Sequence, residues 1–524
     1  MENKFKPLRI EFLSIFIILI CFFFGAQSVF AASTPKKGGT ITVAMNTDIT
    51  TLDHYNSTAL INGAVFMHIL EPLVAYGKNL EIVPVLAERW EISQDYKTYT
   101  FHLMKGKLFH NGEEMTAEDV KYSLECIVDP HRCVRATLFE KVDNIEIVDK
   151  YAVKVNLKEP DTRLLHSLAY MSPIMAVIPK GEIEKQGGSI KHPMGTGPYK
   201  FVEWKPDRHI IFEKFDKYKA RTDARNGLGG ERIAYLDRIK FVPIHEEAVS
   251  IMAILNKEVD FLQFYPPKYV KKYNSDYKNK GIVLHEITGL AWPVIFFGME
   301  SPIVKNLKFR QACAYAIDRD VVVQAAFLGH AEKTASVVPE SNQYWTPYHK
   351  TWYKKDLNKA KQLLKESGYN GEEVVIQTSK NFAYMFNDAI AVQSELKDAG
   401  IKTKINMVDW PVLIKDKYLK GDYQILSFGA VPCPDPAMAY KYLVRNKFEK
   451  VFPKAKEARE ESLRTADFAK SVKIFEELHK MTYEQVPMIV LCHYNRINAS
   501  RDYVKGYEPL STAMPRFWGV WLDK

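Results

Sequence analysis

The sequence has little glycine and proline, few cysteines and no dense block of one charge. Glycine and proline contribute 26 residues each to the 524, which excludes collagen-like and low-complexity chains. The 72 lysines and arginines only modestly outnumber the 63 aspartates and glutamates, so the charge does not favour nucleic-acid binding. A mean hydropathy of −0.23 excludes a polytopic membrane protein. What remains is an ordinary globular composition, 47% hydrophobic, with enough length for two or more packed cores.

The N-terminal segment departs from this composition. Lys4, Lys6 and Arg9 precede an apolar run from Phe12 to Phe24, and small residues surround Ala31. A basic start, a short apolar stretch and a small-residue cleavage site are typical of a secretory signal peptide. We therefore predict export and cleavage after Ala31. The alternative is a membrane anchor, which needs about 20 apolar residues, whereas this run has 13.

Cysteines are too sparse for a disulfide scaffold in an exported chain of this length. Cys21 leaves with the signal peptide, and the others are Cys126, Cys133, Cys313, Cys433 and Cys492. Their odd number predicts a free thiol, unless one pairs with another chain. Cys126 and Cys133 flank His131 and form a small disulfide, two buried thiols or part of a metal site. The spacing lacks the second ligand pair of a structural zinc site, so we predict no metal and no cofactor.

Catalytic signatures are missing as well. The sequence contains no GxxxxGK[ST] phosphate loop, no GxSxG nucleophile elbow and no HExxH zinc helix. The glycine-rich stretch Gly195–Tyr199 contains Pro198, which removes an amide that a phosphate site would use, so it predicts a tight turn before a strand. We predict a protein that is not an enzyme. A secreted hydrolase with scattered active-site residues is the alternative.

Strand and helix patterns alternate along the chain. Residues 40–45 and 99–103 have the period of two of β-strands, and residues 145–157 predict a hairpin that turns at Asp149-Lys150. Thr116 is the expected N-cap of a helix that Pro130 ends. Further along, a strand over 374–376, a helix ending at Gly400 and a strand over 401–407 predict a right-handed βαβ unit. Helices are also expected over 309–317 and from Asp356 to Gly368. The fold class is therefore α/β.

Several segments, taken in order, resemble the extracytoplasmic solute-binding proteins of ABC importers, in the peptide/nickel-binding class. They are Gly38–Thr40, Ile69–Leu73, Pro84–Trp90, Tyr99–Leu103, Phe109–Gly112, Thr116–Val120, His192–Tyr199, Arg310–Arg319 and Lys359–Leu364. The resemblance covers nearly the whole exported chain.

The resemblance implies a two-lobed periplasmic-binding-protein-like fold of type II, with an extra domain inserted in the first lobe. The signal peptide would be residues 1–31. The first lobe would comprise 32–74, 194–289 and 499–524, the inserted domain 75–193, and the second lobe 290–498. Hinges are expected near Gly289-Leu290 and near Ala499.

The same resemblance places ligand-binding residues in the cleft between the lobes. In the family the loop after the first strand lines this cleft, which here implies Tyr55, Asn56, Thr58 and Asn62. Trp292, by the hinge crossing, and Trp410 and Phe428, in the second lobe, would add aromatic walls. The alternative for each aromatic residue is a place in the core.

The ligand's chemistry stays open at the level of sequence. Peptide-binding members carry an acidic residue three positions before an acidic-Pro pair, which receives the peptide's ammonium group. Here the pair is Asp435-Pro436 and the earlier position is Pro432, so Asp435 either substitutes or caps a helix. Arg132 and Arg135 either clamp a carboxylate or are solvated.

The resemblance therefore implies a periplasmic, monomeric substrate-binding component of an ABC transporter, which captures a peptide or other small solute for the permease transmembrane subunits. Closure over the ligand would shift an open–closed equilibrium and involve no covalent chemistry. Besides the hydrolase, a ligand sensor that docks on a signalling receptor is an alternative. No nucleic-acid partner is expected.

Overall fold

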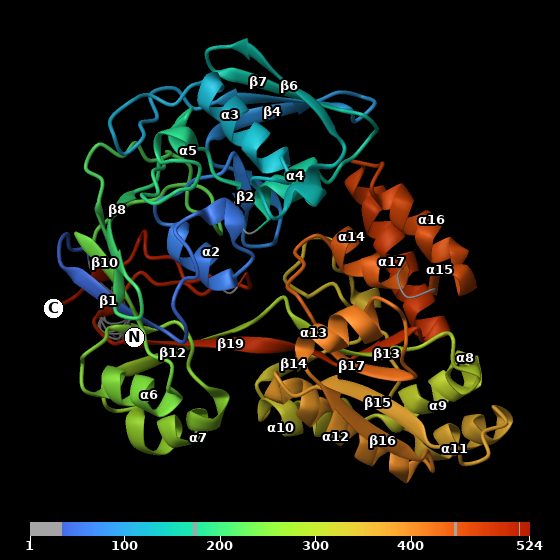
Figure 1. Ribbon diagram of the computed structural model, residues 1–524. Helices are drawn as coiled ribbons and strands as arrows, with labels where there is room; N and C mark the ends of the chain where they lie inside the picture. Colours follow the sequence, from blue (N-terminus) through green and yellow to red (C-terminus); the bar gives the residue numbers. More distant parts are fainter. Residues whose placement is uncertain (1–33, 171–174, 445–447, 513) are drawn as a thin grey trace, which may run out of the picture. The chain divides into compact units, whose positions relative to one another are not determined.

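The computed structural model describes residues 34–170, 175–444, 448–512 and 514–524, without the side chains of residues 449 and 450 (Figure 1). The predicted signal peptide lies outside the described residues. Residues 1–36 and 37–524 form separate units, and the second is described below. Within the ranges given, no helix combines the length and the apolar character needed to cross a membrane.

The largest sheet of the described residues has eight strands in the order β12-β19-β11-β1-β10-β9-β8, with β14 beside one end of β19. The strands are β1 (Thr40–Met45), β8 (Tyr199–Lys205), β9 (His209–Lys214), β10 (Arg238–Pro243), β11 (Phe261–Leu262), β12 (Ile282–Thr288), β14 (Ala331–Lys333) and β19 (Cys492–Arg501). β1 pairs in parallel with β10 and β11. β19 runs antiparallel to β11 and β12. The strand predicted over 40–45 is confirmed as β1.

A second sheet has the order β16-β15-β17-β13-β18. Its strands are β13 (Trp292–Phe297), β15 (Val374–Ser379), β16 (Thr403–Val408), β17 (Ile425–Ala430) and β18 (Met488–Val490). β15 is parallel to β16 and β17, whereas β13 is antiparallel to β17 and β18. The predicted βαβ unit is confirmed as β15, α12 (Ala383–Asp398) and β16.

The two sheets share one topology. In each, three parallel strands are followed across the sheet by an antiparallel strand and then by the last strand, as β10-β1-β11-β19-β12 and β16-β15-β17-β13-β18. In each sheet the antiparallel strand comes directly after a crossing from the other sheet, because β12 leads into β13 and β18 leads into β19. This reciprocal exchange is the type II arrangement that the resemblance implies.

A separate four-stranded sheet has the order β4-β5-β7-β6. Its strands are β4 (Ala87–Ile92), β5 (Thr98–Leu103), β6 (Val142–Asp149) and β7 (Ala152–Leu157), and α3 (Ala117–Val128) packs on it (Figure 1). The predicted hairpin at Asp149-Lys150 is confirmed. So is the helix start at Thr116, whose backbone N–H and hydroxyl both donate to the Asp119 carboxylate, at 2.8 and 3.0 Å.

The remaining elements connect and cover these sheets. The short strands are β2 (Val74–Tyr76), β3 (Ile82–Pro84), β20 (Val504–Lys505) and β21 (Trp521–Leu522). The helices are α2 (Leu60–Phe66), α4 (Leu164–Ala169), α5 (Glu182–Lys185), α6 (Glu247–Leu255), α7 (Val270–Lys272), α8 (Pro302–Lys305), α9 (Leu307–Ala316), α10 (Arg319–Phe327), α11 (Leu357–Glu366), α13 (Trp410–Val412), α14 (Pro436–Ala439), α15 (Phe448–Val451), α16 (Pro453–Ser462) and α17 (Phe468–Gln485). The helices predicted over 309–317 and after Asp356 are confirmed as α9 and α11.

Two chain crossings join the sheets, and they lie side by side. Gly289 donates its backbone N–H to the carbonyl of Tyr494 at 3.1 Å, directly after the last β12–β19 pair, Thr288 with Asn495. A Cβ at Gly289 would lie 2.9 Å from that carbonyl oxygen, so only glycine allows this approach. β19 changes partner at the same level, from β14 at Tyr494 to β12 at Asn495. Ala499 lies further along β19, paired with Leu284 and Leu262.

The glycine-rich stretch before β8 owes its glycines to close packing. A Cβ at Gly195 would lie 2.3 Å from the Ile69 carbonyl oxygen, and one at Gly197 would lie 2.7 Å from the Ile69 carbonyl carbon. Such distances are far below van der Waals contact, so any side chain there would displace the backbone after α2. The stretch precedes a strand, as predicted, but its glycines are needed for this contact.

A buried ionic cluster joins the four-stranded sheet's domain to the eight-stranded sheet. Glu71 forms an ion pair with Lys107, with 2.9 Å between Oε2 and Nζ, and a longer one with Arg232, with 3.5 Å between Oε1 and Nη1. The hydroxyls of Thr196 and Tyr218 also donate to Glu71, at 2.8 and 2.7 Å. Burial opposes ionisation of Glu71, but the two cations outweigh it and lower the pKa of its carboxyl. Glu71 is therefore ionised, and the removal of either cation would leave a buried carboxylate with too little compensating charge.

We expect Lys107→Met to destabilise the protein by about 3–5 kcal/mol, because it removes one partner of a buried ion pair. The control is Lys150→Met, which breaks the exposed pair between Lys150 and Glu114 and should cost about 0–1 kcal/mol. Urea unfolding measures both. Equal losses in the two variants would contradict the role given to the cluster.

Asp388 on α12 is a buried carboxyl group whose ionisation should affect the stability of the protein. It is 1% exposed, and neither carboxyl oxygen has a hydrogen-bond partner among the described residues. Burial raises the pKa of this carboxyl well above its ordinary value. The folded state then retains a proton that the unfolded state releases, so the stability contribution falls as pH rises above the unfolded pKa of about 4.

We expect Asp388→Asn to flatten this pH dependence, because the amide does not titrate. Between pH 4 and pH 8 the free energy of unfolding of the variant should therefore increase relative to that of wild type. The exposed Asp207→Asn is the matched control and should follow the wild-type curve. Urea unfolding at several pH values measures the slopes, and parallel curves for Asp388→Asn and wild type would show the account of Asp388 to be wrong.

Candidate functional site

An apolar cavity lies beside the crossing from β12 to β13, next to the ends of α2, β2, α4 and β17. Its wall includes Leu60, Tyr76, Tyr170, Leu290, Pro432 and Met514, and its volume is about 30 Å³. Leu290 is in the crossing between β12 and β13, and Pro432 follows the carboxyl end of β17. Ligands of α/β proteins bind outside the carboxyl ends of parallel strands. The apolar cavity is therefore at the place where this fold presents a ligand site.

The other walls of the apolar cavity come from distant parts of the chain. Leu60 begins α2, Tyr76 ends β2, Tyr170 follows α4, and Met514 belongs to the C-terminal segment. The hydroxyl oxygen of Thr512, which also lines the cavity, is buried and has no hydrogen-bond partner among the described residues. Such a group gains a hydrogen bond when a polar ligand atom reaches it.

A larger polar cavity of about 280 Å³ adjoins the first one. Arg163, His166, Tyr344 and Asp435 lie in its wall. Tyr76 connects the two cavities, because its ring lines the apolar one and its hydroxyl lies 3.1 Å from Nδ1 of His166. The two cavities also share the Pro434-Asp435 segment, with one residue in each wall.

The polar cavity has an uneven charge distribution. Arg163 is already neutralised by Asp161, which accepts from Nε at 3.1 Å and from Nη2 at 2.9 Å. Burial lowers the pKa of His166, so this imidazole is neutral at pH 7. Burial and the nearby Asp435 carboxylate raise the pKa of Tyr344 to about 12. Two acidic residues in this wall, Glu81 and Asp435, have no ion-pair partner among the described residues. Both Glu81 oxygens accept hydrogen bonds, from the Asn79 N–H at 2.9 Å and the Asn226 amide at 2.7 Å.

The Asp435 side chain has one occupied oxygen and one unoccupied oxygen. Oδ1 accepts the backbone N–H of Ala437 at 2.9 Å and caps α14. Oδ2 is buried and has no partner among the described residues, while the residue as a whole is 3% exposed. The helix-cap interpretation of this residue is confirmed, and contact of its free oxygen with a ligand stays a prediction.

The three predicted aromatic residues lie in the second sheet's core or at its margin. Trp410 stacks on Phe428 with ring centroids 5.4 Å apart, and Phe428 stacks on Tyr418 at 4.8 Å. Trp410 is half-buried and Phe428 is 5% exposed. Trp292 is fully buried against the edge of Tyr442. These residues do not line the apolar or the polar cavity.

The loop after β1 is placed by its own hydrogen bonds. Tyr55 is 1% exposed and donates its hydroxyl to the Ala176 carbonyl at 3.0 Å. Asn62 is buried, donates to the Thr51 carbonyl at 2.8 Å and accepts from the Thr50 N–H at 3.1 Å. Asn56 and Thr58 are exposed. The segment reaches the apolar cavity two residues after Thr58, at Leu60.

The two arginines considered as carboxylate clamps have partners within the chain. Arg132 pairs with Glu184 at 2.8 Å. Arg135 donates to the Thr58 carbonyl at 3.5 Å and lies over the ring of Tyr170, with its guanidinium carbon 5.3 Å from the centroid. Because Tyr170 lines the apolar cavity, Arg135 is the closer of the two to a ligand there.

The structure distinguishes between the disulfide, the buried thiols and the metal site considered for Cys126 and Cys133. Cys126 and Cys133 are both buried free thiols. Burial raises the pKa of the Cys126 thiol to about 11, so the group is protonated at neutral pH. In the part of the chain that the structure describes, no three His, Cys, Asp or Glu side chains come close enough to hold a metal ion.

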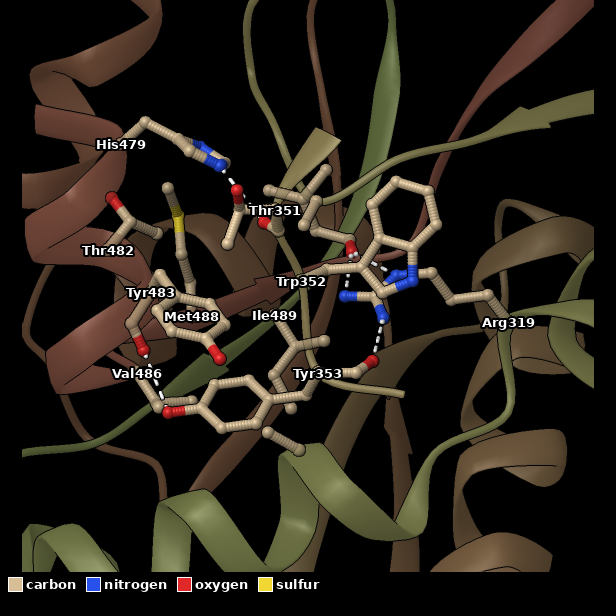
Figure 2. Close-up of a pocket in the computed structure, with 13 residues that line it drawn as sticks. Arg319, Thr351, Trp352, Tyr353, His479, Thr482, Tyr483, Val486, Met488 and Ile489 are labelled. Atoms are coloured by element: carbon tan, nitrogen blue, oxygen red, sulfur yellow. Dashed lines mark hydrogen bonds between the residues drawn. The ribbon is translucent and has the colours of Figure 1, made fainter. Parts of the chain in front are cut away.

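A third cavity, of about 20 Å³, surrounds the buried Arg319 (Figure 2). Its guanidinium donates to the carbonyls of Thr334, Val490 and Tyr353 at 3.0–3.2 Å. Figure 2 shows the Trp352 indole beside it and the Tyr353 hydroxyl directed at Tyr483. These carbonyls occupy the guanidinium, so Arg319 ties together backbone segments of the second sheet's domain.

Sequence reasoning missed most of the cavity walls. Tyr170, Leu290 and Met514 stand in segments without a motif, and His166 lies on a helix with no polar pattern around it. The one available signal was Leu290, next to the glycine of the expected hinge. The others come together only through tertiary contacts, such as that between Tyr76 and His166, which are 90 residues apart in sequence.

The topology and the cavity at the crossing define a ligand-binding protein of the type II class. Residues 81–450 match the model of the bacterial extracellular solute-binding proteins, family 5. The chain belongs to this family. The sequence-based resemblance to solute-binding proteins of ABC importers, in the peptide/nickel-binding class, is confirmed, as is the α/β type II fold.

Individual relatives agree with this assignment. The chain is 29% identical to a glutathione-binding protein, GsiB, of Pectobacterium atrosepticum over 388 residues, 74% of this chain and 72% of the relative. Among solved structures, AgaA of A. tumefaciens R10 in complex with agropinic acid is 27% identical, with a TM-score of 0.72 over 93% of this chain and 99% of that one. HbpA2 from Haemophilus parasuis shares the fold, with a TM-score of 0.81, 21% identity and coverage of 93% and 100%.

Proposed function

We propose that this protein is the substrate-binding component of an ABC transporter, and that it captures a peptide or other small solute in the apolar and polar cavities for import. The observation that carries the proposal is the wall of the apolar cavity. It combines Leu60 of α2 and Met514 of the C-terminal segment with Pro432, which follows β17 of the second sheet, and with Leu290 from the crossing. A solute held there contacts both sheet domains at once.

Closure over the solute follows from this placement. Contacts from both domains exist together only when the domains are close, so a solute that makes them shifts the equilibrium toward the closed form. The hinge would be the paired crossings at Gly289 and at Tyr494-Asn495. Because β19 pairs with β12 from Asn495 onward, the moving parts would be residues 32–74, 194–289 and 495–524 with the inserted 75–193, against residues 290–494. The closed form would then be presented to the permease transmembrane subunits.

The walls suggest a solute with an apolar part and a cationic group. The apolar cavity offers aliphatic and aromatic surface, and Asp435 Oδ2 offers an unpaired acceptor in the adjoining polar cavity. A relative is named for binding glutathione, which is a tripeptide with an ammonium group. A short peptide or an amino-acid derivative of similar size therefore fits best. Among the predicted residues, Asp435 is the one we place against the ligand.

The proposal extends to the protein's setting. Binding is reversible and leaves the solute chemically unchanged, so the protein is not an enzyme. It works as a monomer in the periplasm after a signal peptide is removed at Ala31. A short peptide is transferred intact in this scheme, and turnover assays on mixed peptides and esters should detect no product.

We expect Leu60→Trp to block the apolar cavity and to weaken solute binding at least tenfold, because the added ring occupies the space of the ligand. Native mass spectrometry of the purified wild type, with the solute carried over from the cell, identifies the ligand as a mass increment. Leu419→Trp, at an exposed site outside the cavities, is the matched control and should keep the increment. Retention of the ligand by Leu60→Trp would contradict the placement of the site.

We expect Asp435→Asn to preserve the cap on α14, since an amide oxygen also accepts the Ala437 N–H, while it removes the negative charge from the polar cavity. Affinity for a cationic solute should fall by roughly tenfold to a hundredfold, in the range of a lost hydrogen bond to a charged group. Asp435→Ala should lose the cap in addition, at about 1 kcal/mol of stability. Calorimetric titration with the identified ligand measures the affinities. Unchanged binding by Asp435→Asn would exclude this residue from ligand contact.

A further inference from the structure

The outward face of α6 is apolar although nothing described covers it. Val249 is 55% exposed and Met252 is 50% exposed, one helical turn apart. The inward face is formed by Ile251 and Ile254, both buried. Ser250, the polar residue inside this helix, is buried as well and donates to the Glu247 carbonyl at 2.8 Å. A helix that is apolar on both sides is normally covered on both sides, so α6 lacks a partner on its outer face.

A lysine-rich segment stands next to this face. Between residues 266 and 281 the chain carries Lys268, Lys271, Lys272, Lys278 and Lys280 against a single acidic residue, Asp276. All five lysines are exposed. Three of them lie over tyrosine rings, with Nζ of Lys268 5.3 Å from the Tyr269 centroid and Nζ of Lys272 and Lys280 5.5 and 5.8 Å from that of Tyr277. Long basic side chains in this arrangement cover apolar surface and keep their charges in solvent.

Core packing holds the two features together. Ile251 and Ile254 of α6 share a hydrophobic cluster with Tyr265, which precedes the lysine-rich segment, and with Tyr277, which lies within it. An ion pair from Lys268 to Glu247 ties the segment to the first turn of α6. Figure 1 shows α6 and α7 side by side. The exposed apolar face and the lysines thus belong to one surface, which we call the basic-apolar surface.

We infer that the basic-apolar surface docks on an anionic lipid membrane. With Lys257 and the acidic residues Glu246, Glu247 and Glu258 of α6 and its ends included, the surface carries six lysines against four acidic residues. Anionic headgroups match this excess of positive charge, and the Val249 and Met252 side chains match the apolar boundary beneath the headgroups. Amphipathic surfaces of this composition bind the membrane interface through buried apolar area and electrostatic attraction together. Docking would concentrate the protein at the surface in which a transport partner resides. The inference does not depend on the identity of the solute.

The test is sedimentation of the purified chain with lipid vesicles. Vesicles containing phosphatidylglycerol should bind the protein better than vesicles of phosphatidylcholine alone, and high salt should remove the difference. The triple variant Lys271→Ser, Lys272→Ser and Lys278→Ser should reduce the partition coefficient roughly a hundredfold, since each lysine contributes about fivefold. Val249→Ser with Met252→Ser should also weaken binding, but without a change in its salt dependence.

The matched control removes the same number of charges elsewhere, through Lys361→Ser, Lys365→Ser and Lys397→Ser on α11 and α12, which are exposed. It should bind anionic vesicles almost as wild type does. Any membrane affinity of the N-terminal apolar run is common to all variants and cancels in the comparison. Equal binding to both vesicle types, or an equal loss in the control, would overturn the inference and point to an acidic protein as the partner of this surface.

Discussion

The structure depends on one constraint, the pairing of β19 with strands of two different domains. At Tyr494 this strand is bonded to β14, and from Asn495 onward it is bonded to β12. Gly289 lies against the same point, where its backbone touches the Tyr494 carbonyl. In the hinge that we propose, a change in the angle between the two domains is therefore absorbed in a few residues that lie side by side. The apolar cavity begins at the very next residue, Leu290, so a movement at the hinge is also a movement of the cavity wall.

The domain of the four-stranded sheet, which we propose is inserted in the first lobe, completes the cavities and is held in place by ion pairs. Lys107 comes from this domain, whereas Glu71, Thr196, Tyr218 and Arg232 come from the segments around it. Groups from several segments contact the buried Glu71 carboxylate. A shift of this domain would therefore expose a charged group to solvent or leave it buried without its ion-pair partner. This rigidity places Tyr76, Tyr170 and His166 where the second domain's Pro434-Asp435 segment meets them. The polar cavity is a consequence of that fixed position.

Local patterns in the sequence were sufficient for much of the fold and for little of the site. The capping box at Thr116, the hairpin at Asp149 and the βαβ unit around α12 depend on neighbours in sequence, and the structure has all three. Tyr55 illustrates the limit. It stands in a polar loop, yet its hydroxyl reaches Ala176 and its ring is buried. Segments far away in the chain decide which side of a loop faces a cavity. Tyr55, for example, shares a hydrophobic cluster with Leu510 and Trp518, and the periodicity of the sequence does not predict such contacts.

The central claim is that this protein closes over a solute and releases it unchanged. Small-angle X-ray scattering of the purified chain, stripped of its carried-over solute and then resupplied with it, tests this claim most directly. The account predicts a smaller radius of gyration with the solute bound and a return to the larger value on its removal. An identical radius in both states, at a solute concentration that saturates binding, would contradict it.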